Sequence, residues 1–376
     1  MDKMPNVINV TKTYLPPLEE YVEYLEQIWA ANWVTSHGPL VKELEARLKD
    51  YLGVRHLFFV SNGTVALQIA IRALALHGEI ITTPFSYVAS TSSIVWEGCT
   101  PVFVDIDPDT LCLDPDLIEG AITPQTTAIL PVHIYGHPCD VDRIQSIADQ
   151  HGLRVIYDAA HAFGVRHNGH SLPDHGDISA LSFQATKLFH TVEGGALVTD
   201  DDELAHRIRY MRNFGHKGTE EFCGLGVNGK NSEFHAAMGL CVLARLPDII
   251  AGRKAVCDLY DELLAGSGLS RPKRPVGTSY NYAYYPVIFP SEEVLLSTQA
   301  RLNEEGIVPR RYFFPPLTAL DYVRHADTPV AQDVSARILC LPLHDGLPAR
   351  DVARISCLIA KAVEPSGGLT SSVTGS

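Results

Sequence analysis

Short apolar runs alternate with longer amphipathic stretches along most of this chain. Seven short runs carry apolar side chains at most positions, which is typical of strands that are buried on both faces of a sheet. The stretches between them repeat apolar residues every three or four positions, as helices do. This βαβ rhythm predicts an α/β domain with a mostly parallel, seven-stranded sheet. The predicted strands are residues 57–60, 79–82, 101–106, 127–134, 154–157, 178–183 and 196–199.

Helices are predicted both before the first strand and between the strands. The helix over 39–52 ends at Gly53, and Asp200 or Asp201 is a suitable N-cap for the helix that follows the last strand. A longer helical pattern runs from Ser232 to Leu264, with an expected interruption at Pro247. The other predicted helices are residues 18–33, 65–76, 86–96, 114–122, 141–151 and 202–212.

The helical pattern and the stretch that follows it divide the chain. We expect a large domain over residues 1–250 and a smaller α+β domain over 251–364, because a segment rich in glycine and proline, 265–277, resembles a hinge. The small, polar residues 365–376 predict a disordered tail.

Composition and charge narrow the class of protein. Of the 376 residues 46% are hydrophobic, which is enough for a large core and excludes general disorder. Lys and Arg total 30 against 44 Asp and Glu, a net charge of −14, so no nucleic-acid partner is expected. The N-terminus lacks an apolar signal region, and Thr, Ser and Pro interrupt the most apolar window, 80–96. A soluble, cytoplasmic protein without a membrane partner is therefore predicted.

Cysteine and histidine spacing gives little support for a metal site. The eight cysteines are scattered without a C-x-x-C pair, as expected of free thiols in a reducing compartment. His133, His137 and Cys139 have a spacing that suits zinc, but no further clustered thiol completes a set of four ligands. No metal is predicted.

Three features follow predicted strands, where ligands of parallel sheets bind. Residues 61–64, Ser-Asn-Gly-Thr, join a strand to a helix whose free N–H groups can hold a phosphate, although they also suit a plain helix cap. Asp158 directly follows the run RVIY. Its carboxylate either faces a bound heterocycle or serves as the N-cap of a helix. Lys187 lies between two strands with Ser182 before it, and a loop lysine is usually solvated.

Together these features match the needs of pyridoxal 5′-phosphate (PLP). Its aldehyde needs a lysine amine, its ring nitrogen needs a carboxylate, and its phosphate needs N–H and hydroxyl donors. Composition and periodicity alone do not establish this cofactor.

The chain resembles the DegT/DnrJ/EryC1/StrS family of PLP-dependent nucleotide-sugar aminotransferases over nearly its whole length. The resemblance implies PLP fold type I, the aspartate-aminotransferase-like fold, with a large domain and a smaller C-terminal α+β domain. The motifs that carry it are NWVTSHGP, FVSNGTVAL, ITTPFSYVAS, PVFVDID, VIYDAAHAFG, SFQATKLFHTVEGGALVTD, GVNGKNSEFHAAMGL and LPLH.

The resemblance implies roles for named residues. Lys187 would bind the cofactor covalently and shuttle the proton, Asp158 would pair with the ring nitrogen, and His161, where relatives often have Gln, would lie near the ring hydroxyl. The remaining implied cofactor contacts are the backbone of Gly63 and Thr64 and the hydroxyl of Ser182 at the phosphate, and Tyr87 stacked on the ring.

The family is typically a homodimer in which an Asn of one subunit reaches the partner's cofactor phosphate. Asn228 matches that position. The chain then departs from the family, reading Asn-Gly-Lys where relatives often read Asn-Tyr-Arg. Lys230 would offer charge to a substrate diphosphate, but without the bidentate fork of Arg.

Two interpretations are available for each of the other candidate substrate contacts. His190 is equally a sugar contact or a satisfied loop histidine. Arg310, Arg311 and Tyr312 lie where relatives bring the small domain towards the site, although a solvated strand end with a packed aromatic fits as well. We expect Arg311 and Tyr312 to contact substrate.

The resemblance implies a ping-pong transaminase that takes its amino group from L-glutamate. The segment SFQATKLFHTVEGGA resembles relatives that act on 4-keto-6-deoxy sugars, which predicts conversion of dTDP-4-keto-6-deoxy-D-glucose to dTDP-4-amino-4,6-dideoxy-D-glucose for an O-antigen lipopolysaccharide or a natural product. The alternatives are a 3-keto or UDP-linked substrate, or a non-catalytic, regulatory PLP-binding protein. A sugar dehydratase of this family would carry His in place of Lys187.

Overall fold

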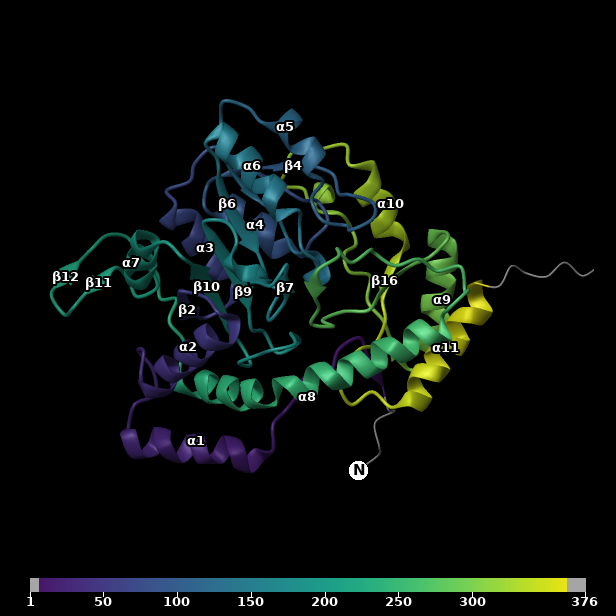
Figure 1. Ribbon diagram of the computed structural model, residues 1–376, viewed down its shortest axis with the longest axis horizontal. Helices are drawn as coiled ribbons and strands as arrows, with labels where there is room; N and C mark the ends of the chain where they lie inside the picture. The colour runs from purple at the N-terminus through teal and green to yellow at the C-terminus, as the bar shows by residue number, and fades with distance from the viewer. Residues whose placement is uncertain (1–6, 364–376) are drawn as a thin grey trace, which may run out of the picture.

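A seven-stranded sheet forms the centre of the molecule in this computed structural model, which describes residues 7–363 (Figure 1). Neighbouring strands follow the order β2-β10-β9-β6-β5-β3-β4 and are parallel except around β10, which runs antiparallel to β2 and β9. The predicted mostly parallel sheet is therefore confirmed. The strands are β2 (His56–Val60), β3 (Glu79–Thr82), β4 (Thr100–Phe103), β5 (Thr126–Leu130), β6 (Arg154–Asp158), β9 (Ile178–Ser182) and β10 (Gly195–Thr199).

The predicted helices of the large domain are present, most within a few residues of their expected ends. Gly53 ends the second helix with φ of 70°, a backbone conformation that glycine adopts without strain. The segment expected as one helix over 114–122 is instead a 3-10 turn followed by a single helical turn. The helices are α1 (Leu18–Ala31), α2 (Pro39–Leu52), α3 (Gly63–Ala73), α4 (Val88–Trp96), α5 (Ile118–Ala121), α6 (Val141–His151) and α7 (Asp202–Met211).

One long helix, α8 (Glu233–Leu263), runs beneath the sheet and into the second domain (Figure 1). The expected interruption at Pro247 is absent from it, and the helix continues through that residue. Packing against α1 and α2 at one end and α11 at the other supports it where Pro247 removes a backbone donor. Among residues 7–363 it is the one helix long and apolar enough to span a membrane, and half of its most apolar window is buried against the protein.

A second hydrophobic core lies at the C-terminal end of α8. Val256 and Tyr260 of α8 pack there with residues beyond 284. Ile8 joins this core because β1 (Ile8–Asn9) pairs in parallel with β15, so the N-terminal strand lies with the small domain although the sequence placed it in the large one. The elements of this domain are β14 (Pro286–Ile288), α9 (Glu292–Glu304), β15 (Ile307–Val308), α10 (Pro329–Arg337), β16 (Ile338–Cys340) and α11 (Ala349–Val363).

Two small sheets lie outside the central sheet and the second core. β7, β8 and β13 form one, and β11 and β12 form a hairpin that projects from the body of the molecule (Figure 1). The predicted tail at 365–376 lies outside the described residues. The strands are β7 (Arg166–His167), β8 (His170–Ser171), β11 (His216–Lys217), β12 (Glu221–Phe222) and β13 (Thr278–Ser279).

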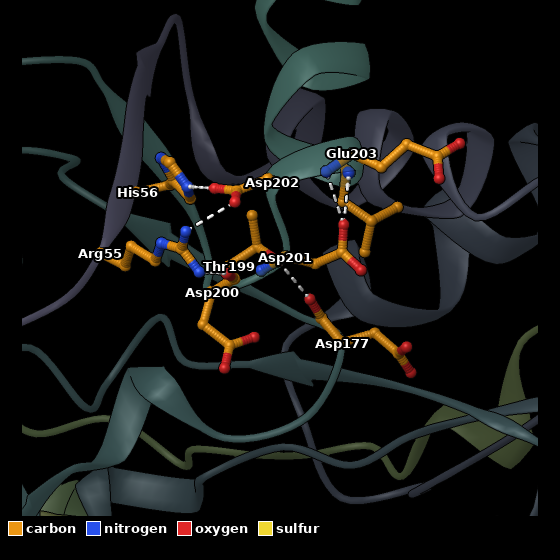
Figure 2. Close-up of polar contacts among 9 residues, drawn as sticks. Arg55, His56, Asp177, Thr199, Asp200, Asp201, Asp202 and Glu203 are labelled. Atoms are coloured by element: carbon orange, nitrogen blue, oxygen red, sulfur yellow. Dashed lines mark hydrogen bonds and ion pairs between the residues drawn. The ribbon is translucent and has the colours of Figure 1, made fainter.

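The junction between β10 and α7 shows how local chemistry starts a helix (Figure 2). The Asp201 carboxylate accepts the backbone N–H of Glu203 at 2.7 Å and of Leu204 at 2.8 Å, which satisfies two donors of the first turn. The carboxylate of Asp202 binds two residues that precede the helix in sequence, Arg55 at 2.6 Å and His56 at 2.8 Å. Asp201 is thus the N-cap, one of the two residues that the sequence offered.

Substitution of the cap tests this assignment. We expect Asp201→Ala to lower the free energy of unfolding by about 1 kcal/mol, because two N–H groups lose their acceptor. Asp201→Asn, which keeps an oxygen, should lose less. Asp200→Ala is the matched control, since Asp200 uses its backbone carbonyl rather than its side chain to bind Arg55. Urea unfolding of the three variants measures the effect, and equal losses for residues 200 and 201 would contradict it.

Candidate active site

An open cavity of about 660 Å³ lies at the carboxyl edge of the central sheet. The ends of β2, β6 and β9 meet there, and the start of α4 and residues of the small domain form its other walls. Its volume is in the range of small-molecule sites. The cavity contains eight of the twelve site residues that the sequence predicted: Gly63, Thr64, Tyr87, Asp158, His161, Ser182, Lys187 and Tyr312.

The turn between β2 and α3 forms an anion cradle at one end of the cavity. The side chain of Asn62 accepts the N–H of Val65 at 2.8 Å and so caps α3, which leaves the N–H groups at its start directed towards the cavity. A Cβ at Gly63 would lie 3.0 Å from the Cβ of Ser182. Glycine therefore lets the helix N-terminus and the Ser182 hydroxyl approach one another, as the phosphate of PLP requires.

Asp158 is buried at the end of β6, and its two oxygens have different partners. Oδ1 accepts the backbone N–H of Ala160 at 3.1 Å, and Oδ2 accepts the hydroxyl of Ser90 at 2.7 Å. Burial raises the pKa of Asp158, and the Ser90 hydrogen bond, the Ala160 N–H and the charge of Lys187 oppose that rise. The carboxylate lines the cavity, where a protonated ring nitrogen would give it a further partner.

A compact turn between β9 and β10 presents Lys187 to the same cavity. The N–H of Lys187 donates to the carbonyl of Gln184 at 2.8 Å, and Nζ donates to the Tyr284 hydroxyl at 3.3 Å. Burial lowers the pKa of Lys187, and the carboxylate of Asp158 opposes this effect. A lysine whose amine is easily deprotonated suits nucleophilic attack and proton transfer.

His161 is a neutral hydrogen-bond donor at the cavity wall. The backbone N–H of Tyr135 donates to its Nδ1 at 3.2 Å, which assigns the ring proton to Nε2. Burial holds the pKa of His161 well below its usual range, with the charge of Lys187 adding to the effect. The Nε2–H is therefore suited to a phenolic oxygen such as the PLP ring hydroxyl.

Aromatic residues from two domains enclose the space between these groups. Tyr87, at the start of α4, is 61% exposed and lines the cavity, so its ring is free to cover a planar ligand. Tyr312 and Phe313 line it from the small domain, and the ring of Phe313 lies parallel to that of His161 at 5.8 Å. The site is thus complete only when the two domains are packed together.

The remaining predicted residues lie elsewhere. His190 is buried and has both ring nitrogens engaged, by the carbonyl of Tyr14 at 2.7 Å and the N–H of Val192 at 3.2 Å, which matches the satisfied loop histidine rather than a sugar contact. Arg311 is not among the residues that line the cavity and binds Glu292 at 2.7 Å, so its predicted substrate contact stays a prediction. Its neighbour Arg310 lines the cavity in its place.

Asn228 and Lys230 lie outside the cavity of their own chain. The amine of Lys230 donates to the Asn228 side chain at 3.0 Å. Asn228 is exposed near the base of the β11–β12 hairpin, while Lys230 lines a separate pocket beside α2 and β2. The structure describes a single chain, so their predicted role toward a partner stays a prediction.

Sequence reasoning missed two residues next to the predicted pair. Tyr284, from the small domain, contacts Lys187, and nothing in the local sequence distinguishes it from its neighbour Tyr285. Ser90 binds Asp158 from α4. The local sequence does not mark Ser90 either, because Ser86 precedes α4 and the partner of Ser90, Asp158, is 68 residues away.

One of the histidines considered for zinc, His133, has other contacts within the fold. Nδ1 of His133 accepts the N–H of Cys139 at 3.1 Å, and the His133 ring stacks on Tyr157 at 4.6 Å. Burial lowers the pKa of both His133 and His137 to about 3. Across residues 7–363 no group of three His, Cys, Asp or Glu side chains is placed to hold a metal ion.

Comparison with known proteins places this geometry in context. The DegT/DnrJ/EryC1/StrS aminotransferase family matches residues 18–359. A dTDP-4-amino-4,6-dideoxy-D-glucose transaminase of Shigella dysenteriae is 42% identical over 348 residues, covering 91% of this chain and 95% of that protein. The Escherichia coli protein of the same name is 40% identical over 366 residues, covering 94% and 98%. The crystal structure of DesI in the presence of its TDP-sugar product has a TM-score of 0.91 at 35% identity, covering 96% of this chain and 94% of that one.

The depressed pKa of Lys187 has a consequence for stability. The unfolded chain binds the lysine proton more tightly than the folded one, so this residue destabilises the cofactor-free fold at neutral pH, and the penalty disappears as pH rises towards 10.5. We expect Lys187→Met to raise the free energy of unfolding at pH 7 by roughly 1 kcal/mol, with a smaller gain at pH 9.5. Denaturant unfolding of the cofactor-free proteins measures this. The control is Lys361→Met, because Lys361 is an exposed residue of α11, and an equal gain there would contradict the argument.

Proposed function

The chain belongs to the DegT/DnrJ/EryC1/StrS aminotransferase family, whose members are PLP-dependent, and we propose that it transfers an amino group from L-glutamate to a nucleotide-linked 4-keto-6-deoxy sugar. The proposed substrate is dTDP-4-keto-6-deoxy-D-glucose, and the product is dTDP-4-amino-4,6-dideoxy-D-glucose. The observation that carries this proposal is that Lys187, Asp158 and the anion cradle line one cavity of a chain 42% identical to a transaminase of that name.

The residues present fit PLP at each of its functional groups. The start of α3 and Ser182 would hold the phosphate, Asp158 would pair with the ring nitrogen, and His161 would donate to the ring hydroxyl. Lys187 would bind the aldehyde carbon. When bound, the cofactor supplies an electron sink that stabilises negative charge on the substrate carbon.

The side chains of the cavity perform the proton transfers. Lys187, when its amine is free, would carry a proton on Nζ between the substrate carbon and the cofactor, away from the amino donor in the first half-reaction and to the acceptor sugar in the second, which its lowered pKa permits. The carboxylate of Asp158 would hold a proton at the ring nitrogen. Tyr284, whose hydroxyl contacts Nζ, would limit the positions that the free amine can take.

Anionic substrate groups require cations at the cavity mouth. Arg310 is exposed there and Tyr312 lies beside it, so we assign both to the substrate's diphosphate or the donor's carboxylate. Lys230 would add positive charge from a second subunit, but its ammonium group lacks the bidentate geometry of an arginine.

We propose that two copies of the chain form the working enzyme. The segment around the β11–β12 hairpin carries exposed apolar side chains, among them Phe222 at 66% and Leu225 at 74% exposure, a feature that marks protein interfaces. Asn228 lies at the base of this segment and would reach the phosphate of the partner's cofactor. The dimer is proposed to act in the cytoplasm, in the synthesis of an amino sugar for an O-antigen or a glycosylated natural product.

A half-reaction panel tests the reaction and its regiochemistry. L-Glutamate should convert the enzyme to its pyridoxamine phosphate form, and after removal of the donor the dTDP-linked 4-keto sugar should restore the original absorbance. Recovery only with a 3-keto or UDP-linked sugar would overturn the substrate. A spectrum that no amino donor changes would instead favour a regulatory PLP-binding protein. Lys187→Ala and Lys187→Arg should abolish turnover while circular dichroism shows an intact fold.

Mixing two variants that are each inactive at limiting cofactor tests the shared site. Asn228→Ala should weaken cofactor affinity by about 10- to 100-fold, because a hydrogen bond to a charged phosphate is lost. Lys187→Ala dimers should be inactive. After subunits are exchanged in equal amounts, one site in four is intact, so about a quarter of wild-type activity should return at limiting cofactor. Mixed dimers that form without any recovery would show that Asn228 serves its own chain.

A further inference from the structure

Two serine hydroxyls extend the hydrogen bonding of Asp158, and the outer one, that of Ser86, belongs to a residue that also lines the cavity. The Ser90 hydroxyl lies 2.7 Å from Oδ2 of Asp158, and the Ser86 hydroxyl lies 3.0 Å from that of Ser90. All three side chains are buried, at 3% exposure for Ser86, none for Ser90 and 6% for Asp158. Ser90 itself is not among the residues that line the cavity, so it acts on a ligand only through Asp158.

The direction of these hydrogen bonds follows from counting donors. A serine has one hydroxyl proton, and the ionised Asp158 only accepts, so the Ser90 proton points to Oδ2. The competing acceptor of Ser90, the carbonyl of Tyr87, is further away at 3.3 Å. Ser86 must then donate to Ser90, and the row runs Ser86, Ser90, Asp158. Aligned hydroxyls of this kind strengthen one another.

We propose that Ser90, supported by Ser86, is a positioning residue that keeps Asp158 ionised and oriented toward the ring nitrogen of the cofactor. Ala160 occupies Oδ1 and Ser90 occupies Oδ2, so the carboxylate is held in its plane by one contact on each oxygen. Loss of the Ser90 contact frees the carboxylate to rotate and removes the hydroxyl that favours its charged form. The ring nitrogen would then retain its proton less strongly.

The inference rests on the proposed placement of the ring nitrogen at Asp158, and the experiment separates the two. The full-length protein is freed of cofactor and titrated with pyridoxamine phosphate, which binds without a covalent bond, and with its analogue in which CH replaces the ring nitrogen. The ratio of the two dissociation constants reports only contacts made through that nitrogen. Changes of packing alter both constants together and leave their ratio unchanged.

Ser90→Ala should lower the preference for the natural ligand about tenfold, as expected for a lost hydrogen bond to a charged group. Ser90→Thr, which keeps the hydroxyl, should preserve the preference, and Ser86→Ala should lower it less. Ser93→Ala is the matched control: Ser93 is buried on the same helix, and its hydroxyl has no partner within residues 7–363. In nitrogen-15 NMR, the labelled ring nitrogen bound to Ser90→Ala should shift towards the value of neutral pyridine.

Asp158→Asn separates the role of Ser90 from the placement of the ring nitrogen at Asp158. If Asp158→Asn abolishes the preference while Ser90→Ala leaves it unchanged, the role of Ser90 is overturned and the cofactor site stands. An equal weakening of both ligands by Ser90→Ala, with no shift of the nitrogen resonance, also overturns it. A preference that survives Asp158→Asn would overturn the placement of the ring nitrogen itself.

Discussion

A buried carboxylate, Asp158, and an amine, Lys187, share one cavity, and the chemistry of the site depends on how their charges are held. Burial disfavours both charged forms, so it raises the pKa of the acid and lowers that of the base. Their mutual attraction opposes both shifts. Asp158 has two further contacts that favour its charge, from Ala160 and Ser90, whereas Lys187 has a weakly polar phenol beside it. This asymmetry favours the charged form of the acid and leaves the amine easier to deprotonate than that of an exposed lysine.

The same cavity keeps His161 uncharged, as a hydrogen-bond donor. Its Nδ1 is occupied by a backbone N–H and its pKa is depressed, so it donates from Nε2 without carrying charge. A neutral donor, an ionised acceptor and a reactive amine are therefore set by their surroundings rather than by residue type. These are the three states that the groups of a PLP ring require.

The central sheet and the long helix α8 place these groups together. Parallel strands bring the ends of β2, β6 and β9 to one edge, so the anion cradle, Asp158 and the lysine turn converge although more than 120 residues separate Gly63 from Lys187. Helix α8 passes through both hydrophobic cores and fixes the small domain against this edge. Tyr284 and Tyr312 reach the cavity for this reason.

The sequence by itself determined the seven strands, most of the helices, a helix cap at Asp200 or Asp201 and the elements that carry Asp158 and Lys187, because these depend on periodicity and on local turn chemistry. Only the tertiary structure decided which side chains meet. Arg310 rather than Arg311 lines the cavity with Tyr312 and Phe313, because the chain turns at this point and the guanidinium of Arg311 binds Glu292 instead. Tyr284 and Ser90 became visible only through contacts across 97 and 68 residues of chain. Local patterns report the conformation of the backbone, whereas the partners of a polar group are set by how distant elements pack.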